Sequence, residues 1–205
     1  EANIFDEQKI RKLFEKTNIC INLIGILYEK KGSSFENIHA LFPSILAKLC
    51  KEYKLNHFIH LSALGINEAS DSNYAKSKLD GETNILKNFP LSTILRPSIV
   101  YSVDDNFTTT FMTLLSRLPI FPIYYSGKTK FTPIHCSDLT DIIYTVISKN
   151  ISSKILECVG PKVITFREII EILLNLMNKK RILIPLPLPI ANLTARFFQL
   201  FPKPL

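Results

Sequence analysis

Short apolar runs alternate with amphipathic segments along the first half of the chain. Each run is four to eight residues long and lies between turn-forming residues, as expected for strands of a parallel sheet that is buried on both faces. In the segments between the runs, apolar residues recur every three or four positions, which is typical of amphipathic helices. The predicted strands are 19–26, 57–61 and 92–95, and the predicted helices are 6–16, 38–53 and 74–87.

Single residues set the expected ends of these helices. Asp6 can cap the first helix, and Asn88, two residues before Pro90, should close the third. Pro43 lies inside the second helix and should kink it or make it start late. The alternation of strand and helix predicts an α/β fold with a Rossmann-like, doubly wound parallel sheet.

The pattern changes after Arg96-Pro97, where prolines and glycine interrupt mixed segments. Thr165 and Glu168 form a capping box, which should open a helix. The elements expected here are a strand over 131–134, helices over 138–148 and from 165 to about 177, and a last amphipathic segment that follows the proline-rich stretch 184–189 and ends near 198.

These elements suggest a division into two parts. We expect a partial Rossmann domain over 1–118 and a smaller, mixed, substrate-type C-terminal region over 119–205, which returns to the Rossmann core around 131–148.

Composition excludes several classes of protein. The chain has 205 residues, of which 46% are hydrophobic, so it can bury a full core. The net charge is +7, but the lysines are scattered, so we expect no nucleic-acid partner. The four cysteines stand far apart and no His/Cys cluster occurs, so no metal site is expected. No apolar run approaches the roughly 18 residues that span a bilayer, which predicts a cytoplasmic protein with at most peripheral membrane association.

The sharpest candidate for chemistry is a serine at a strand end, followed by a tyrosine and a lysine on the next helix. Tyr74 and Lys78 stand four residues apart and share one helix face, and Ser62 follows the strand 57–61. A nearby ammonium favours the phenolate and should lower the pKa of Tyr74. Such a tyrosine can exchange a proton with a carbonyl or alcohol while a nicotinamide exchanges hydride. The alternative is a tyrosine and a solvated lysine on an ordinary surface helix.

These residues resemble the short-chain dehydrogenase/reductase (SDR) family. Ser62, Tyr74 and Lys78 match its catalytic triad, and YAKSKLDGE is similar to the Tyr-Lys-Gly-Glu helix of its extended and atypical members. The resemblance implies a bound NAD or NADP, with NADPH the form that it favours, and an aspartate cap, Asp138, on the later helix. The residues implied to contact the dinucleotide are Asn3, Ile4, Asn22, Leu23, Ile24, Gly25, Ser62, Tyr74, Lys78, Pro97, Ser98 and Ile99.

The resemblance narrows to one branch of the family. HLSALGINEASDSNYAKSK and ILRPSIVYSVDDNF are most similar to the NAD(P)H-binding accessory subunit of respiratory complex I and its bacterial relatives. This implies an accessory or assembly role linked to respiratory NADH:quinone oxidoreductase, with respiratory-complex subunits as partners, at the inner face of the respiratory membrane.

Two alternatives stay open. The intact triad is compatible with an active NAD(P)-dependent oxidoreductase or epimerase. The six glycines contain no GxxGxxG or GxGxxG motif, so the family's first strand and phosphate-binding loop are absent from this sequence. A truncated, non-functional remnant is therefore the second alternative.

The remaining polar residues carry weaker expectations. The histidines 39, 57, 60 and 135 should be packing or surface residues. Asp104-Asp105 should be a loop and a helix N-cap rather than a pair of catalytic carboxylates. The stretch 182–198 is apolar and basic at its ends, so it either lies on a membrane or partner or packs on its own domain.

Overall fold

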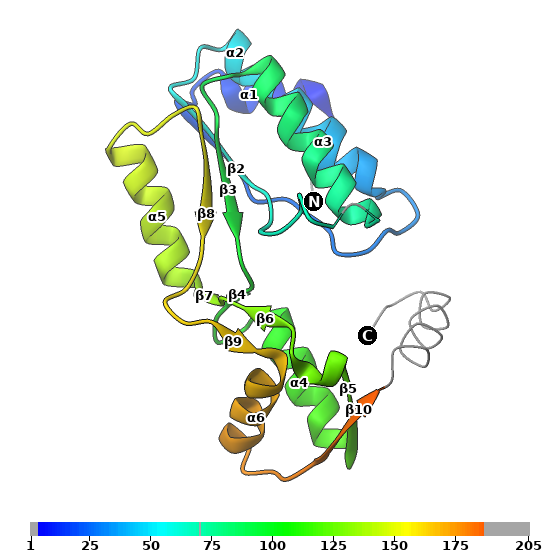
Figure 1. Ribbon diagram of the computed structural model, residues 1–205. Helices are drawn as coiled ribbons and strands as arrows, with labels where there is room; N and C mark the ends of the chain where they lie inside the picture. Colours follow the sequence, from blue (N-terminus) through cyan, green and yellow to red (C-terminus); the bar gives the residue numbers. More distant parts are fainter. Residues whose placement is uncertain (1–3, 70, 187–205) are drawn as a thin grey trace. The chain divides into compact units, whose positions relative to one another are not determined.

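The computed structural model describes residues 4–69 and 71–186 (Figure 1). The chain folds into two compact units and passes between them more than once. The first unit comprises Glu1–Pro97 and Thr140–Cys158, and the second comprises Ser98–Leu139 and Val159–Leu205. The predicted boundary at residue 118 separates a cofactor-binding region from a substrate-type region. The packing of the chain does not test such a division of roles, so it stays a prediction.

The first unit is built on a parallel sheet of order β1-β2-β3-β8. Figure 1 shows α3 on one side of this sheet and the end of α5 on the other. The first four residues of β2 are all buried, as expected for an inner strand covered on both faces. The predicted α/β class with a Rossmann-like parallel sheet is confirmed. The strands are β1 (Ile19–Asn22), β2 (His57–Leu61), β3 (Thr93–Pro97) and β8 (Lys154–Cys158), and the helices are α1 (Glu7–Phe14), α2 (Phe42–Glu52), α3 (Asn73–Asn88) and α5 (Cys136–Ser148), which begins in the second unit.

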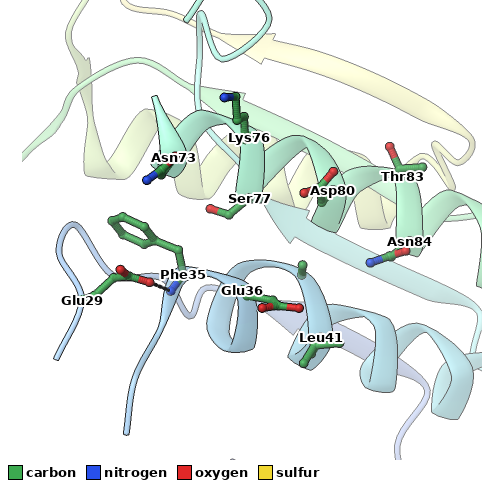
Figure 2. Close-up of a pocket in the computed structure, with 11 residues that line it drawn as sticks. Glu29, Phe35, Glu36, Leu41, Asn73, Lys76, Ser77, Asp80, Thr83 and Asn84 are labelled. Atoms are coloured by element: carbon green, nitrogen blue, oxygen red, sulfur yellow. Dashed lines mark hydrogen bonds between the residues drawn. The ribbon is translucent and has the colours of Figure 1, made fainter. Parts of the chain in front are cut away.

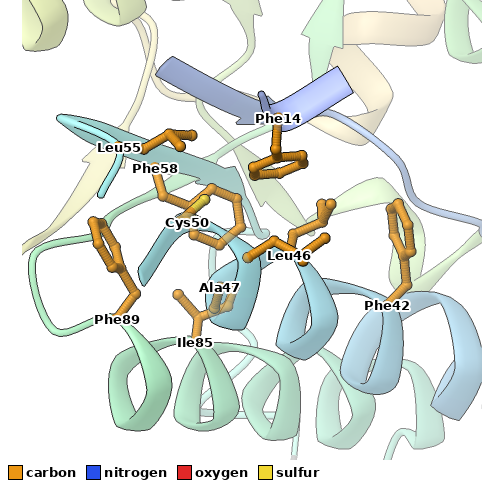
Figure 3. Close-up of a cluster of buried hydrophobic side chains, with 10 residues drawn as sticks. Phe14, Phe42, Leu46, Ala47, Cys50, Leu55, Phe58, Ile85 and Phe89 are labelled. Atoms are coloured by element: carbon orange, nitrogen blue, oxygen red, sulfur yellow. The ribbon is translucent and has the colours of Figure 1, made fainter. Parts of the chain in front are cut away.

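The core of this unit lies between one face of the sheet and the helices α1, α2 and α3. Figure 3 shows Phe58 of β2, Leu46 of α2 and Ile85 of α3 pointing into one cluster. Phe14 of α1 joins them and is 6% exposed. Burying side chains of this size contributes about 1.5–3 kcal/mol each, so the apolar spacing that predicted these helices also positions them on the sheet.

The α-helical part of the predicted helix 38–53 begins late, at Phe42, but the backbone before it is already helical. A π-helical segment, Glu36–Leu41, leads directly into α2, and Pro43 lies in the first turn of α2. Proline has no N–H to donate, and it stands where the winding changes from π to α.

The predicted strand 19–26 is half as long in the structure. β1 ends at Asn22, whose side-chain Oδ1 accepts a hydrogen bond from the backbone N of Ile24 at 3.1 Å. This local bond takes the chain out of the sheet. Leu23 and Leu27 are therefore 62% and 78% exposed, although they continue the apolar run.

Gly81 brings α3 into backbone contact with the π-helical segment. A Cβ placed on Gly81 would lie 1.9 Å from the backbone oxygen of His39. No side chain fits this space, so only glycine allows the two helices to approach this closely.

The second unit contains short paired strands and two long helices. α4 (Asn106–Arg117) and α6 (Phe166–Leu176) pack around an apolar cluster that includes Leu115, Ile123 and Ile170. The strand pairs are β4 (Val100–Tyr101) with β7 (Ile134–His135), β5 (Ile120–Tyr124) with β10 (Ile182–Leu186), both parallel, and β6 (Lys130–Phe131) with β9 (Ile164–Thr165), antiparallel.

Two helix caps in this unit are confirmed. The Thr165 hydroxyl accepts from the N of Glu168 at 3.2 Å, and the Glu168 carboxylate accepts from the N of Thr165 at 2.6 Å. Asp105 caps α4 by accepting from the N of Thr108 at 2.6 Å.

Other expectations for this unit are wrong. The predicted strand 131–134 is split into β6 and β7, because Thr132-Pro133 interrupts it and proline has no N–H for a ladder. Asp138 does not cap α5: the helix begins at Cys136, and Asp138 lies in its first turn. The first residues of the proline-rich stretch 184–189, which was expected as a connection, belong to the strand β10 (Ile182–Leu186). The segment expected to end near 198 lies outside the described residues.

Within residues 4–69 and 71–186, no helix combines the length and the apolar character needed to cross a membrane.

Candidate functional site

The carboxyl ends of β1 and β2 meet α3 at a buried lysine. Lys78 is 4% exposed, and its Nζ donates to the backbone oxygen of Leu61, the last residue of β2, at 3.1 Å. A Cβ placed on Gly25, in the loop after β1, would lie 3.4 Å from the same Nζ. The structure therefore brings together three predicted site residues from separate elements: Gly25, Lys78 and, next to Leu61, Ser62.

The Ser62 hydroxyl is buried without a partner. Its side chain is 6% exposed, and its Oγ makes no hydrogen bond within the described part of the chain. Buried polar groups are nearly always paired, and leaving one unpaired costs about 1–3 kcal/mol. An unpartnered hydroxyl at the carboxyl end of a parallel strand fits a site that supplies an oxygen ligand, such as a nicotinamide dinucleotide or its substrate.

His60 of β2 is neutral, and its Nε2 can donate a hydrogen bond. The amide Oδ1 of Asn22 accepts from the N of Ile24, so its Nδ2 is the group that faces His60 Nδ1, at 3.0 Å. The amide therefore donates to Nδ1, and the ring proton is assigned to Nε2. Burial, and then the charge of Lys78, lowers the pKa of His60 to about 3. Its Nε2 has no partner among the described residues.

His39 links the loop after β1 to the helix of the candidate triad. Its Nε2 accepts from the backbone N of Ile26 at 3.1 Å, so its Nδ1 carries the proton and donates to Ser77 Oγ at 2.9 Å. Ser77 Oγ donates in turn to the backbone oxygen of Tyr74 at 2.8 Å. Burial, and then the charge of Lys78, lowers the pKa of His39 to about 4. The ring therefore stays neutral, which this pattern of bonds requires.

The environment of Tyr74 differs from the expected one. Its ring packs edge-on against Phe35, with ring centroids 5.8 Å apart, and against His39, at 5.2 Å. Burial raises its pKa, so the predicted lowering by Lys78 is wrong. The ammonium of Lys78 is directed to the Leu61 carbonyl, and the phenol lies among neutral rings. Tyr74 is therefore protonated at neutral pH and can donate a proton rather than accept one.

Burial has the opposite effect on Lys78. It lowers the pKa of the ammonium to about 8, and the negative charge of Glu82 partly opposes this shift. The lysine is thus still charged at pH 7 and can donate hydrogen bonds to a ligand oxygen.

A buried ion pair attaches α3 to β3. Arg96 Nε donates to Glu82 Oε1 at 3.0 Å, and Arg96 NH2 donates to Oε2 at 2.6 Å. The two side chains are 11% and 4% exposed. This two-point contact fixes the helix that carries Tyr74 and Lys78 against the sheet.

A separate hollow of about 500 Å³ lies between α3 and the π-helical segment. Figure 2 shows Asp80 and Ser77 of α3 facing Phe35 and Glu36 across it. Glu29 also lines the hollow and accepts from the N of Phe35 at 2.7 Å. Three carboxylates against the single ammonium of Lys76 leave the lining negative, so this hollow does not fit the anionic phosphates of a dinucleotide. In the described part of the chain, no group of three His, Cys, Asp or Glu side chains is placed to hold a metal ion.

The other predicted contacts stay predictions. Asn3 lies outside the described residues. Ile4 packs against the core cluster of the first unit. Leu23 and Ile24 are exposed, at 62% and 39%. Pro97 is the last residue of the first segment of the first unit, and its carbonyl accepts from the N of Leu64. Ser98 and Ile99 begin the second unit.

Sequence reasoning missed the role of His39 and Ser77. His39 lies within the predicted helix 38–53 and was expected to be a packing or surface residue. It is fully buried, but its partners lie 13 and 38 residues away in the sequence, and no local pattern connects them.

We expect acid to destabilise the first unit through the two buried histidines. Both pKa values are lowered from about 6.5, so stability is complete above pH 6.5 and is lost as the pH falls toward 4. Each histidine should contribute a slope of about 1.4 kcal/mol per pH unit. Urea unfolding at pH 7, 6, 5 and 4 measures this slope. His39→Phe should remove about half of it, and an unchanged slope in that variant would contradict the assignment.

The family comparison agrees with this geometry. The family described as the RmlD substrate binding domain matches residues 2–192. The chain belongs to this family. The predicted resemblance to SDR-like proteins is thereby confirmed.

One curated relative is NADH dehydrogenase (ubiquinone) 1 alpha subcomplex subunit 9, mitochondrial, of Arabidopsis thaliana. It is 31% identical over 193 residues, which cover 93% of this chain and 48% of the relative. The predicted similarity to a complex I accessory subunit is confirmed. The chain spans about half the length of the curated relatives that it matches.

Solved structures show the same fold. UDP-glucuronic acid 4-epimerase of Bacillus cereus, in complex with UDP-glucuronic acid and NAD, has a TM-score of 0.75 and 22% identity, over 90% of this chain and 67% of that one. dTDP-4-dehydrorhamnose reductase of Bacillus anthracis, in complex with NADP, has a TM-score of 0.75 and 15% identity, over 92% and 73%.

Proposed function

We propose that the chain supplies part of a dinucleotide site in an accessory or assembly subunit associated with respiratory NADH:quinone oxidoreductase. The observation that carries the proposal is the buried ammonium of Lys78, held at the end of β2 beside Gly25 and the unpartnered Ser62 hydroxyl. The name of the Arabidopsis relative supports the respiratory partner. We propose a peripheral location at the inner face of the respiratory membrane on the same ground.

The residues of the site suit NADP or NAD, with NADPH the form that the family resemblance favours. Lys78 would donate hydrogen bonds to ribose hydroxyls, and Ser62 would pair its hydroxyl with a ligand oxygen. The loop at Asn22, Leu23, Ile24 and Gly25 would lie beside the adenosine, with its position fixed through His39. A bound dinucleotide would supply hydride.

The alternative function is an active reductase. The observation that favours it is the protonated phenol of Tyr74 on the same helix as Lys78, because a phenol can donate the proton that a carbonyl takes up during reduction. In this reading Ser62 orients the substrate carbonyl and Lys78 holds the ribose.

The test is the nucleotide content of the natural full-length protein and of Gly25→Val. The added methyl groups would enter the space of the Lys78 ammonium, since even a Cβ lies 3.4 Å from it. We expect wild-type protein to retain nucleotide through purification and Gly25→Val to bind it at least about tenfold more weakly, or about 1.4 kcal/mol. Chromatography of the denatured supernatant measures this. Leu27→Ala, on the same loop and 78% exposed, is the matched control.

Tyr74→Phe separates the two functions. An accessory subunit should keep its nucleotide and its place in the respiratory complex in this variant. If Tyr74→Phe instead abolishes an NAD(P)H-linked turnover, the reductase is the correct function. A wild-type protein that retains no nucleotide and binds none in titration would exclude both.

A further inference from the structure

The second unit contains an apolar cavity of about 510 Å³ between α4 and α6. Sites for small molecules commonly measure about 300–1,000 Å³. All of the residues that line this cavity belong to the second unit, so the cavity is independent of the site at Lys78. We refer to it as the α4–α6 cavity.

The lining is suited to an alkyl chain. Eleven of the fifteen lining residues are aliphatic, aromatic hydrocarbon, methionine or proline side chains, and the other four are Tyr101, Ser102, Thr108 and Lys162. Apolar area removed from water is the main source of binding free energy in such a cavity.

Two of the three hydroxyls that line the cavity already have partners. Thr108 Oγ1 donates to the carboxylate of Asp105 at 2.5 Å, and Ser102 Oγ accepts from the N of Asp104 at 3.3 Å. Few polar groups of the lining are therefore left to replace the hydrogen bonds that a sugar would lose from water, and that loss is costly. This argues against a carbohydrate ligand.

The rim of the cavity is apolar, with one cation. Val103 is 93% exposed, Leu176 is 75% exposed and Ile172 is 48% exposed. These apolar side chains continue the apolar lining to the mouth of the cavity, so a ligand that protrudes from it would still bury apolar surface. Lys162 is the one charged residue of the lining, and it is exposed. Its ammonium complements an anionic headgroup at the mouth while the chain lies inside.

We propose that the α4–α6 cavity binds a single acyl chain that carries an anionic headgroup. The ligand is a free fatty acid or one chain of an anionic lipid. Its hydrocarbon contacts Ile172, Leu173 and Phe107, and its carboxylate or phosphate pairs with Lys162. The proposal does not depend on the dinucleotide site.

The experiment is calorimetric titration of the natural full-length protein with octanoate, decanoate and dodecanoate. Each buried methylene should tighten binding up to about fourfold, so each two-carbon step should lower the Kd up to about 16-fold. Ile172→Glu should weaken decanoate binding at least about tenfold. Leu13→Glu, which puts the same charge on an exposed leucine of α1 in the first unit, should have no effect.

The headgroup is tested with Lys162→Gln. This variant should weaken the binding of decanoate several-fold and leave that of decanol unchanged. Retention of the protein on phosphatidylglycerol vesicles, lost in Ile172→Glu, would identify a lipid chain as the ligand. Binding of decanoate without retention on vesicles would identify a free fatty acid.

Two results would overturn the proposal. One is an affinity that does not depend on chain length, and the other is an Ile172→Glu variant that binds decanoate as tightly as wild type. Nucleotide content is measured in the same samples. Wild-type protein that binds decanoate but contains no nucleotide would contradict the proposed function alone. Wild-type protein that contains nucleotide but does not bind decanoate would contradict this inference alone.

Discussion

Replacing Glu82 by alanine is expected to lower the free energy of unfolding by about 3–5 kcal/mol. The carboxylate binds Arg96 through two hydrogen bonds, at 3.0 and 2.6 Å, and its side chain is 4% exposed. Without Glu82 the guanidinium, whose side chain is 11% exposed, keeps a long contact of 3.4 Å to Asn67 and the weaker attraction of Glu157. An uncompensated buried charge costs far more than the pair itself contributes. Urea unfolding at pH 7 measures the change.

The matched control is Glu171→Ala, which breaks an ion pair on the surface of α6. Arg167 and Glu171 are 3.6 Å apart, with side chains 38% and 50% exposed. Exposed pairs contribute about 0–1 kcal/mol. A Glu82→Ala variant no less stable than this control would show that α3 does not depend on the buried pair for its position.

Replacing Lys78 by methionine should stabilise the fold while it removes a ligand of the proposed site. The folded protein lowers the pKa of Lys78 from 10.5 to about 8, because the ammonium is buried. Holding that charge at pH 7 therefore costs the folded state about 3 kcal/mol. Methionine has a similar length and no charge. Loss of the bond to Leu61 offsets about 1–2 kcal/mol of this, so we expect a net gain of about 1–2 kcal/mol at pH 7.

The pH dependence identifies the cause. Between pH 8 and 10.5 the unfolded lysine keeps its proton and the folded one loses it, so the stability of the wild type rises with pH in this window. Lys78→Met should not show this rise, and its advantage should shrink as the pH increases. Thermal unfolding at pH 7, 8, 9 and 10 measures the difference, with the exposed Lys76→Met as control. A variant that is less stable than wild type at pH 7, or an advantage that does not change with pH, would contradict the argument.

Lys78 and the elements around it show what the sequence could predict. The strand 57–61 and the helix from Asn73 to Asn88 follow local rules of periodicity and capping, and both were predicted within one residue. The position of Lys78 on one helix face follows from the same periodicity. Its buried state and lowered pKa do not, because they depend on Leu61 and on the loop at Gly25.

Expectations failed where one side chain outweighed a pattern. Asn22 ends β1 in the middle of an apolar run by binding its own backbone. β10 was missed because Pro185 suggested a connection, whereas the strand pairs with β5 about 60 residues earlier in the chain. The pKa of Tyr74 was predicted in the wrong direction because spacing on a helix does not reveal where the Lys78 ammonium points.

The close contact at Gly81 controls the hydrogen bonds of His39, although Gly81 itself forms none of them. A methyl group there would have to displace the backbone of His39, because it would lie 1.9 Å from the backbone oxygen of that residue. His39 reaches Ile26 and Ser77 through bonds of 3.1 and 2.9 Å, and both weaken steeply when stretched. Gly81→Ala would thus release the loop around Gly25 from α3, although none of the residues that hold the two together is changed.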